Sequence, residues 1–318
     1  LSHLALKNGF TEDNGAALFS FFSQVDLNHL VLRDNYALDH GGALAFDHAS
    51  GSLTSIEMMN NSGYNGGACN FLHSPMEVTN CLIAKNTALN NGGAFFTEYS
   101  KLAIRNCTFY QNSCHEDGSV ICSEWQQSNV ITNSIIWNHD AYLFRGLTSP
   151  IISYSNVEGG YHGAGNLNVK PDFVNPGEDL YYLKHRDSGQ DSDSPCINAG
   201  NMAASDCMAG NKSLYQMTSY TSNLPDTGIV DLGYHYRRHS LCDTLGCEIS
   251  MPATTFKPGD DCSCTVTVCN PSNLTFHDIP LFIVLEAYGD LFFAPRFIPF
   301  DYYLTLIPPG ETVIPVLD

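Results

Sequence analysis

A short glycine-containing element recurs through the N-terminal third of the chain and constrains the fold more than any other feature. Its successive copies read NGAALF, GGALAF, GGACNF, GGAFFT and DGSVIC. The glycines fall at Gly15, Gly42, Gly67, Gly93 and Gly118, at intervals of 27, 25, 26 and 25 residues. A fixed period of about 20 to 50 residues is typical of stacked repeat architectures. The repeat therefore predicts a fold built from equivalent units that pack on one another.

An asparagine that closes an apolar segment recurs with the same period. It falls at Asn35, Asn61, Asn86, Asn112 and Asn138, at intervals of 26, 25, 26 and 26 residues. Each unit contains short strand-like runs such as VTNCLIA and GGAFFT, and helical periodicity is absent. So small a unit cannot bury its own apolar face. We predict an all-β fold, a right-handed single-stranded parallel β-helix of roughly eight or nine coils over residues 1–238.

The repeated residues have defined roles in such a stack, where equivalent residues lie about 4.8 Å apart. Asparagine tolerates left-handed backbone and can hydrogen-bond to its counterparts on neighbouring coils. Gly42, Gly67 and Gly93 each follow another glycine, and these glycine pairs are expected to supply a positive φ at a tight corner, with the following alanine in the interior. Cys81 and Cys107 each stand five residues before a repeat asparagine. They should therefore meet, as a thiol pair or as a disulfide between rungs.

These elements resemble a known group of proteins. The GGA element and the FxxN-like element that ends at Asn112, with variants ending at Asn61 and Asn86, resemble the repeats of chlamydial polymorphic outer-membrane proteins and related bacterial surface β-helix proteins. The stretches GNLNVKPDFVNPGEDLYYL, SPCINAG and VDLGYHY resemble the closing rungs of bacterial right-handed β-helix repeat proteins. The resemblance implies a fold and a bacterial surface location. It does not imply one activity, because such β-helices include lyases, hydrolases and adhesins.

A second domain is expected over residues 239–318, where the repeat stops. Strand-like runs such as CEISM and SCTVTVCN alternate there with Pro-Gly turns, which predicts a small β-sandwich. The SCTVTVCNPS run and the PPGET turn resemble the immunoglobulin-like modules of bacterial surface proteins. The strand-like end VIPVLD suggests that the sandwich is incomplete, and the opening LALKNGF reads as a coil in progress. We therefore expect a longer precursor.

Twelve cysteines are many for a chain of 318 residues. Their local spacing favours disulfide bonds and an oxidising, extracytoplasmic compartment, with free core thiols as the alternative. Zinc is disfavoured because the sequence has no CxxC pair. The candidate disulfide pairs are Cys107 with Cys114, Cys196 with Cys207, Cys242 with Cys247, and Cys262 with Cys264 or Cys269.

The best group of histidines and carboxylates in the repeats consists of Asp39, His40, Asp47 and His48, which bracket one GGA corner. Glycoside hydrolysis needs two carboxylates about 5 to 9.5 Å apart. The equivalent positions carry Asn65 and Ser74 on the next rung and Asn91 and Glu98 on the following one, so no ladder of carboxylates builds up. We expect solvated turn residues here and not a catalytic site.

A second candidate site is the segment HRDSGQDSDSP, in which Asp187, Asp191 and Asp193 are closely spaced. An oxygen-rich loop of this kind could bind Ca²⁺, the one cofactor that the sequence suggests. The segment lacks the glycine and the terminal glutamate of a helix-loop-helix calcium site. A flexible acidic loop without a cation is the alternative.

The aromatic residues offer a third candidate. Tyr110, Trp125, Trp137 and Tyr142 could form a strip on which sugars stack, or could belong to the stacked core. Bulky side chains at repeat-equivalent positions usually lie in the interior of a solenoid. We therefore expect them to be core residues.

Composition narrows the function. The chain has 14 Lys and Arg against 33 Asp and Glu, a net charge of −19, which disfavours nucleic acid as a partner and would repel an acidic polysaccharide. No apolar run approaches the roughly 18 residues of a membrane span. Motifs of serine hydrolases, zinc proteases and nucleotide-binding proteins are missing.

From these observations we expect a non-enzymatic bacterial protein at the cell surface or outside the cell. Its β-helix would be a rigid rod for adhesion, ligand presentation or assembly, with a carbohydrate or a surface protein as partner. The first alternative is a polysaccharide lyase or glycoside hydrolase of the pectin-lyase-like type. The second is a subunit of an extracellular filament that self-associates through unpaired strand edges.

Overall fold

The structure is a computed structural model that describes residues 1–125, 128–139 and 142–238. In the C-terminal part it describes residues 246–250, 264–270, 275–281, 284–287, 290–293, 303–307 and 310–317. The chain divides into two compact units, Leu1–Arg238 and His239–Asp318, and each is described by itself. None of the helices in the described residues has the length and apolarity needed to cross a bilayer.

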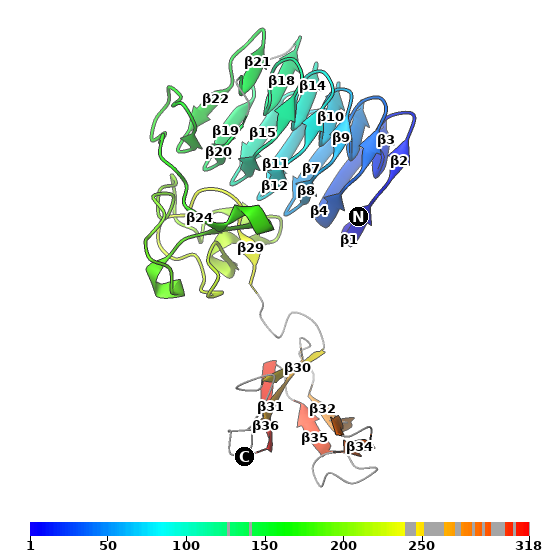
Figure 1. Cartoon of the computed structure of the whole chain (residues 1–318), viewed down its shortest axis with the longest axis vertical. Helices are drawn as coiled ribbons and strands as arrows, with labels where there is room; N and C mark the ends of the chain where they lie inside the picture. Colours follow the sequence, from blue (N-terminus) through cyan, green and yellow to red (C-terminus); the bar gives the residue numbers. More distant parts are fainter. Residues whose placement is uncertain are drawn as a thin grey trace. The chain divides into compact units, whose positions relative to one another are not determined.

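The first unit is a parallel β-solenoid of about five turns, as the repeat predicts (Figure 1). Three parallel sheets run along it. The 12-stranded sheet has two arms, joined through β4. One arm is β1 (Ser2–Lys7), β4 (Gln24–Arg33), β7 (Ser50–Thr54), β11 (Met76–Thr79), β15 (Leu102–Arg105), β19 (Val130–Thr132) and β22 (Ile151–Ser153). The other is β8 (Glu57–Met59), β12 (Leu82–Ala84), β16 (Thr108–Tyr110), β20 (Ile135–Trp137) and β23 (Asn156–Val157).

The other two sheets complete each turn. The six-stranded sheet contains β3 (Leu18–Phe21), β6 (Leu44–Asp47), β10 (Cys69–Leu72), β14 (Phe95–Glu98), β18 (Ile121–Glu124) and β21 (Phe144–Gly146). The five-stranded sheet contains β2 (Phe10–Thr11), β5 (Tyr36–Ala37), β9 (Ser62–Gly63), β13 (Thr87–Ala88) and β17 (Ser113–Cys114).

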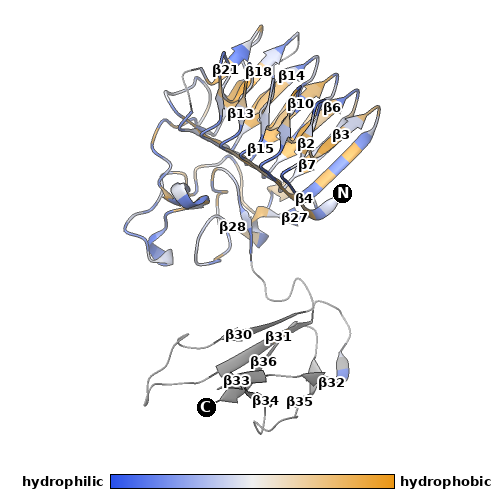
Figure 2. Cartoon of the chain, turned by 45° about the vertical axis from the view of Figure 1, so that its right-hand side comes forward, coloured by the Kyte–Doolittle hydropathy of each residue, from blue (hydrophilic) through white to orange (hydrophobic). Residues whose placement is uncertain are grey.

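The core of the solenoid consists of equivalent apolar residues that stack from turn to turn. Phe46 stacks on Phe71, and Phe71 contacts Phe95, with ring centroids 5.4 Å and 5.5 Å apart. The alanines that follow the repeated glycines, such as Ala43 and Ala68, are fully buried, as expected. Figure 2 shows the strands of the solenoid coloured predominantly as hydrophobic. One continuous core therefore holds the turns together.

The repeat asparagines form a buried hydrogen-bonded ladder. Nδ2 of Asn61 donates to Oδ1 of Asn86 at 2.9 Å, and Nδ2 of Asn86 donates to Oδ1 of Asn112 at 2.9 Å. Asn35 donates in the same way to Asn61. Each Oδ1 also accepts the backbone N–H of the asparagine on the preceding turn.

The ladder ends differently from the sequence-based prediction. His139, and not Asn138, is the residue that follows Asn112, because the backbone N–H of Asn112 points to His139 Nδ1 at 3.2 Å. Asn138 lies one residue earlier, in an exposed left-handed turn with φ 59°. The constant interval of about 26 residues hides a step of 27 at this point.

The paired glycines have two different roles. The first glycine of the pair takes the positive φ, with values of 69° at Gly41, 70° at Gly66 and 72° at Gly92. The glycine pairs therefore supply the expected positive φ, but through their first member and not through Gly42, Gly67 or Gly93. These second glycines are required because neighbouring turns come too close for a side chain, and a Cβ on Gly67 would lie 2.3 Å from the carbonyl oxygen of Gly93.

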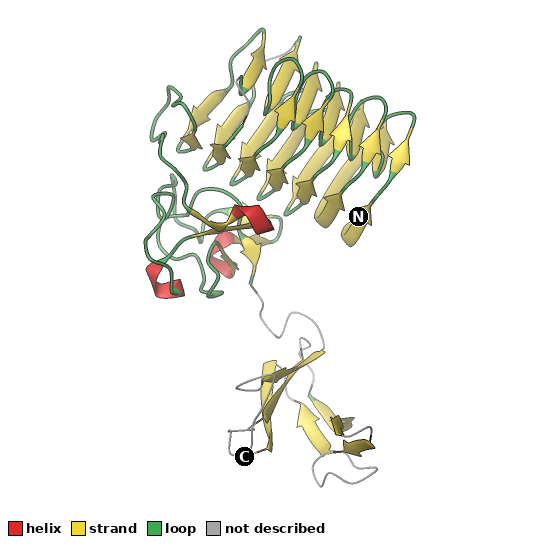
Figure 3. Cartoon of the chain, in the orientation of Figure 1, coloured by secondary structure: helices red, strands yellow, loops and turns green. Residues whose placement is uncertain are grey.

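The parallel sheets end at β22 and β23, after which an isolated parallel bridge joins Asn156 to Leu167, so the prediction of eight or nine coils is wrong. The segment that follows, residues 170–238, is called the flanking segment here, and its strands pair antiparallel. It contains β24 (Phe173–Asn175), η1 (Pro176–Glu178), β25 (Leu180–Leu183), η2 (Arg186–Ser188), β26 (Met208–Ala209), β27 (Lys212–Ser213), η3 (Leu214–Gln216), β28 (Met217–Thr218) and β29 (Tyr236–Arg237). Figure 3 shows these short elements beside the solenoid.

Apolar contacts attach the flanking segment to an outer face of the solenoid. Phe173, Tyr181 and Leu232 form a buried cluster with Met59 and Leu82 of the solenoid. Ion pairs add to this contact at the rim, where Asp179 lies 2.7 Å from Lys85 Nζ and 3.4 Å from Arg33 Nη1. The segment therefore covers the side of the rod and does not extend it.

The second unit is described mainly by its backbone. Its strands form three antiparallel ladders: β30 (Gly246–Ser250) with β31 (Cys264–Asn270) and β36 (Gly310–Leu317), β32 (Phe276–Leu281) with β35 (Tyr303–Ile307), and β33 (Val284–Ala287) with β34 (Asp290–Phe293). The chain is thus all-β in both units.

The cysteines whose side chains the structure describes form no disulfide bonds. They are Cys69, Cys81, Cys107, Cys114, Cys122, Cys196 and Cys207. The predicted bonds Cys107–Cys114 and Cys196–Cys207 are therefore wrong for the described residues. Cys107 lies in the core, where its Sγ is 3.4 Å from the backbone nitrogen of Cys81 on the preceding turn, whereas Cys114 is partly exposed on β17.

The remaining predicted disulfides cannot be placed in the same way. Cys242 and Cys262 lie outside the described residues, and the side chains of Cys247, Cys264 and Cys269 are also outside them.

Candidate functional site

Five rings occupy one corner of the solenoid on successive turns and form what we call the aromatic ridge. Its members are Phe22, His48, His73, Tyr99 and Trp125, and all five are exposed. Ring centroids lie 4.6 Å apart between Phe22 and His48, between His48 and His73, and between His73 and Tyr99. This spacing follows from the separation of parallel strands, about 4.8 Å. The strands that precede these corners follow one another along one edge in Figure 1.

The backbone of the ridge is unfavourable for rings. All five residues have a positive φ, between 45° and 54°, a region that bulky residues avoid at a cost of about 1–2 kcal/mol each. Another corner of the same turns is also left-handed but is polar throughout, with Asp34, Asn60, Lys85, Gln111 and Asn138. Such strain often marks a functional surface. The ridge therefore differs from the polar corner, because it places bulky rings where small or polar residues would fit the backbone better.

An open cavity of about 370 Å³ lies at the Trp125 end of the ridge. Glu124 and Arg145 line it together with Trp125. Arg145 is fixed by an ion pair with Asp117 at 3.4 Å and by a hydrogen bond to Asn91 Oδ1 at 3.0 Å. The cavity thus combines an aromatic face, a carboxylate and a positioned guanidinium.

Carboxylates accompany the ridge. Asp47, Glu98 and Glu124 directly precede ridge residues at the ends of β6, β14 and β18. Asp47 Oδ1 lies 2.5 Å from Nδ1 of His48. This side of the solenoid therefore combines apolar ring faces with hydrogen-bond acceptors.

The four predicted catalytic candidates fall into two separate pairs. His40 Nδ1 lies 3.3 Å from Asp39, and His48 Nδ1 lies beside Asp47. One pair precedes β6 and the other lies at its end. The strand itself has four residues and is about 13 Å long. His48 belongs to the ridge, while His40 packs beside Phe96, with ring centroids 6.1 Å apart.

The aromatic candidates are divided between surface and core. Trp125 and Tyr142 are 59% and 69% exposed, so the expectation of a core position is wrong for these two. Tyr110 and Trp137 are partly buried and pack against the cluster between the solenoid and the flanking segment, outside the solenoid interior where they were expected. Corners point outward even in a regular repeat, and Trp125 lies at such a corner.

The acidic candidates for Ca²⁺ are paired with cations of the chain. Asp191 Oδ1 lies 2.9 Å from Lys184 Nζ, and Asp193 accepts the backbone N–H of Arg186 at 2.8 Å and pairs with its guanidinium at 3.8 Å. Asp187 belongs to η2 and has no such ion pair in the described residues. The structure therefore does not gather the three carboxylates into one ligand group.

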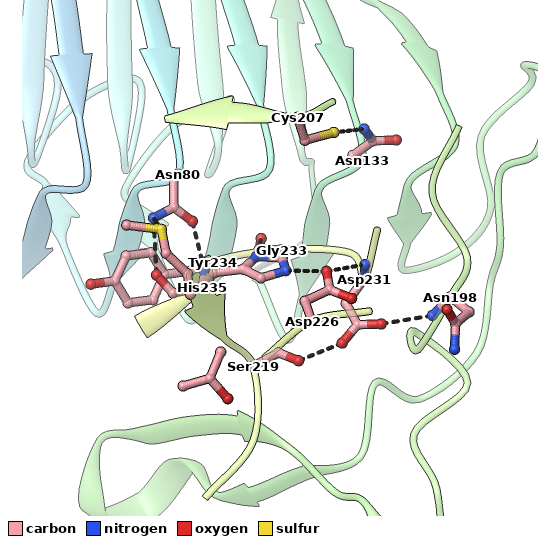
Figure 4. A network of polar contacts seen from close by, with 12 residues as sticks. Asn80, Asn133, Asn198, Cys207, Ser219, Asp226, Asp231, Gly233, Tyr234 and His235 are labelled. Carbon is pink, nitrogen blue, oxygen red and sulfur yellow. Dashed lines mark hydrogen bonds and ion pairs between the residues drawn. The ribbon is translucent and has the colours of Figure 1, made fainter. Parts of the chain in front are cut away.

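A buried polar cluster lies instead in the flanking segment (Figure 4). Asp226, Asp231 and His235 have no solvent exposure, and one ligand atom from each lies within 4.8 Å of the others. His235 Nε2 is 2.8 Å from Asp226 Oδ2, which also accepts the backbone N–H of Asp231 at 2.9 Å. This places two carboxylates and an imidazole together without contact with water.

Further hydrogen bonds hold each member of the cluster. Asp231 accepts the backbone N–H of Asn198 at 2.7 Å and the hydroxyl of Ser219 at 2.5 Å. Burial, with the nearby charge of Asp226, raises the pKa of Asp231. Burial opposes the charge on His235, but its hydrogen bond to Asp226 and the charge of that carboxylate outweigh burial and raise the pKa of His235.

The cluster is anchored to the solenoid by a corner asparagine. The backbone N–H of His235 donates to Asn80 Oδ1 at 2.7 Å, and Asn80 Nδ2 donates to the carbonyl oxygen of His235 at 2.9 Å. Tyr234 adds a backbone hydrogen bond to Thr108 Oγ1 at 2.9 Å. The residues around His235 are therefore part of the contact between the flanking segment and the solenoid.

The sequence singles out two ridge residues, His48 and Trp125, but predicts neither the column of five rings nor the buried cluster, although VDLGYHY resembles a closing motif. A signal for the ridge exists, because its rings follow the repeated glycines by six or seven residues. The sequence signal for the cluster is weaker. Its three members fall within ten residues, but their burial depends on how the flanking segment docks against the solenoid.

Comparison with known proteins adds no further assignment, because no family model, no curated protein and no solved structure matches the chain.

Proposed function

We propose that the chain is a non-enzymatic extracellular surface protein whose solenoid binds an extended glycan along the aromatic ridge. The observation that carries the proposal is the column of five exposed rings in strained corner positions on consecutive turns. Four intervals of about 4.8 Å give a continuous strip of about 19 Å. A chain ligand with a regular repeat suits this strip better than a compact one.

The chemistry of the ridge fits a sugar. The axial C–H bonds of a pyranose form an apolar face that packs on an aromatic ring, and its hydroxyls donate to nearby carboxylates such as Glu98 and Glu124. The rise of one sugar in an extended glycan is comparable with the spacing of the turns. Successive sugars could therefore meet successive rings.

Charge selects among glycans. The ridge is accompanied by Asp47, Glu98 and Glu124, and the whole chain carries a net charge of −19. A neutral glycan or one with amino sugars is compatible with this surface, whereas a uronic-acid polymer would be repelled. We therefore propose a neutral or cationic glycan as the ligand.

A location at the bacterial cell surface is part of the same proposal. The resemblance of the repeats to those of bacterial surface β-helix proteins, and of the C-terminal strands to immunoglobulin-like modules, supports a role at the cell surface. A rigid solenoid loses little conformational entropy when it binds, which favours adhesion or ligand presentation.

Binding can be tested by titrating the full chain with a soluble neutral β-glucan, a chitooligosaccharide and polygalacturonate in a calorimeter. We expect binding of the first or the second and none of the third. Release of reducing or unsaturated ends in the same mixtures would support the lyase or hydrolase alternative instead. Growth of particle size without ligand, followed by light scattering, would support the filament alternative.

Variants locate the binding surface. Tyr99→Asn and Trp125→Asn remove rings but keep residues that tolerate a left-handed backbone, so the fold should persist. Each should weaken binding roughly fivefold or more, the value of one lost ring contact. Tyr215→Ala removes an exposed ring outside the ridge and is the matched control. Equal affinity of all three variants and the parent chain would contradict the proposal.

A further inference from the structure

We propose that Asp226, Asp231 and His235 form a buried site for one divalent transition-metal ion of the Zn²⁺ type. The three side chains lie within a ten-residue stretch and are fully buried, and their ligand atoms lie within 4.8 Å of one another. Two carboxylates and one imidazole are a common ligand combination for such ions. The site would be structural, because no part of it reaches the solvent.

An unpartnered atom within the cluster supports this assignment independently. Asp226 Oδ1 is buried and has no hydrogen-bond partner in the described part of the chain. It belongs to the carboxylate whose other oxygen contacts His235. A buried carboxylate oxygen without a partner is costly, and a bound cation removes that cost.

The orientation of His235 is the one that metal-binding histidines adopt. Its Nδ1 lies 3.0 Å from the carbonyl oxygen of Gly233, so Nδ1 carries a proton and Nε2 faces Asp226. A ligating imidazole usually donates its second N–H to a backbone carbonyl or a carboxylate. Binding would release the proton shared by Nε2 and Asp226 Oδ2 and put the metal ion in its place.

The identity of the ligands also argues against Ca²⁺. Ca²⁺ takes six to eight oxygen ligands, whereas this group offers few oxygens and one nitrogen. Asp231 already accepts hydrogen bonds from Asn198 and Ser219, and these would hold its carboxylate in place for the metal ion. Since His235 is also bonded to Asn80, the ion would stiffen the part of the flanking segment that contacts the solenoid.

The test is to refold the full chain from denaturant with Zn²⁺ or Co²⁺ and remove unbound metal by gel filtration. We expect roughly one metal ion per chain and a visible d–d absorption of Co²⁺ with nitrogen and oxygen ligands. A strong thiolate-to-Co²⁺ charge-transfer band would place the ion on cysteines and overturn the proposal. So would a wild-type chain with less than about a tenth of one ion and no Co²⁺ absorption.

Variants assign the ligands. His235→Gln keeps a donor toward Asp226 but is a poor ligand, and Asp226→Asn removes the charge, so both should lose the metal. Asp206→Asn alters an exposed carboxylate of the same segment and should keep it. Unchanged metal content in the first two variants would overturn the proposal. If either variant fails to fold, the Co²⁺ spectrum of the wild-type chain decides.

Discussion

His139 Nδ1 lies 3.2 Å from the backbone nitrogen of Asn112, the place that asparagine Oδ1 takes on the earlier turns. Its Nε2 lies 3.1 Å from the carbonyl oxygen of Phe109, as Asn112 Nδ2 lies 2.8 Å from that of Ile83. A neutral histidine protonated on Nε2 thus reproduces both the acceptor and the donor of the asparagine. The ladder ends on an imidazole that has to remain neutral.

The first prediction concerns pH. Burial lowers the pKa of His139 to about 4, against its hydrogen bonds to Asn112 and Phe109, whereas the unfolded chain has a value near 6.5. Between these pH values the unfolded state binds more protons than the folded state does. The contribution of His139 to the free energy of unfolding is therefore fully present above about pH 6.5 and is lost as the pH drops toward 4. The loss should reach about 2–3 kcal/mol.

Urea unfolding of the parent chain and of His139→Asn between pH 7.5 and pH 4.5 measures this effect. The variant restores the repeat residue and has no group that titrates there, so the difference between the two chains should change steadily with pH. A difference that stays constant over the whole range would show that His139 is not the group responsible.

The second prediction concerns the interior of the ladder. Asn86→Ala removes an acceptor for two N–H groups of Asn61 and a donor to Met58 and Asn112, all of them buried. Because several polar groups lose their partners, unfolding should become easier by about 2–5 kcal/mol. Asn138→Gly, at the exposed left-handed turn, should change stability by less than about 0.5 kcal/mol. Chemical denaturation of both variants distinguishes a ladder position from a turn position.

The third prediction concerns the thiols. Cys81 and Cys107 are fully buried, and burial together with the neighbouring Cys81 raises the pKa of Cys107. Only the thiolate reacts quickly, so maleimide should modify the partly exposed Cys114 in the native chain and leave the other two until urea is added. Peptide mass spectrometry gives the extent at each site. A peptide pair linked through Cys81 and Cys107 in the unreduced protein would contradict free thiols.

The fold could be predicted wherever a short-range pattern determines it. The interval between Gly67 and Gly93 is one turn, because parallel stacking requires equivalent residues at equal steps. The number of turns could not be predicted, since the apolar residues Phe173 and Leu232 fit an extra rung as well as an outer face. Their true position depends on contacts with Met59 and Leu82, far away in the sequence.

The candidate sites also depend on contacts between residues that are far apart in the sequence. Asp39 and His48 lie close in the sequence, but β6, an extended strand about 13 Å long, lies between them and keeps them apart. His48 and His73 are 25 residues apart and still stack, because one turn returns the chain to the same corner. The repeat could have revealed the ridge, but the buried cluster depends on how the flanking segment docks.

The last prediction concerns the second glycine of the repeat. A Cβ on Gly67 would lie 2.3 Å from the carbonyl oxygen of Gly93 and 2.6 Å from the backbone of Thr87. Both atoms belong to the neighbouring turn, which cannot move without breaking its own ladder, so Gly67→Ala should destabilise the chain by more than about 3 kcal/mol. Gly189→Ala is the matched control, because its φ is 84° and nothing lies within 4 Å of its Cβ. That change should cost only the left-handed backbone, about 1 kcal/mol. Thermal or urea unfolding that ranks the two variants in the opposite order would show that positive φ, and not close stacking, explains the repeated glycines.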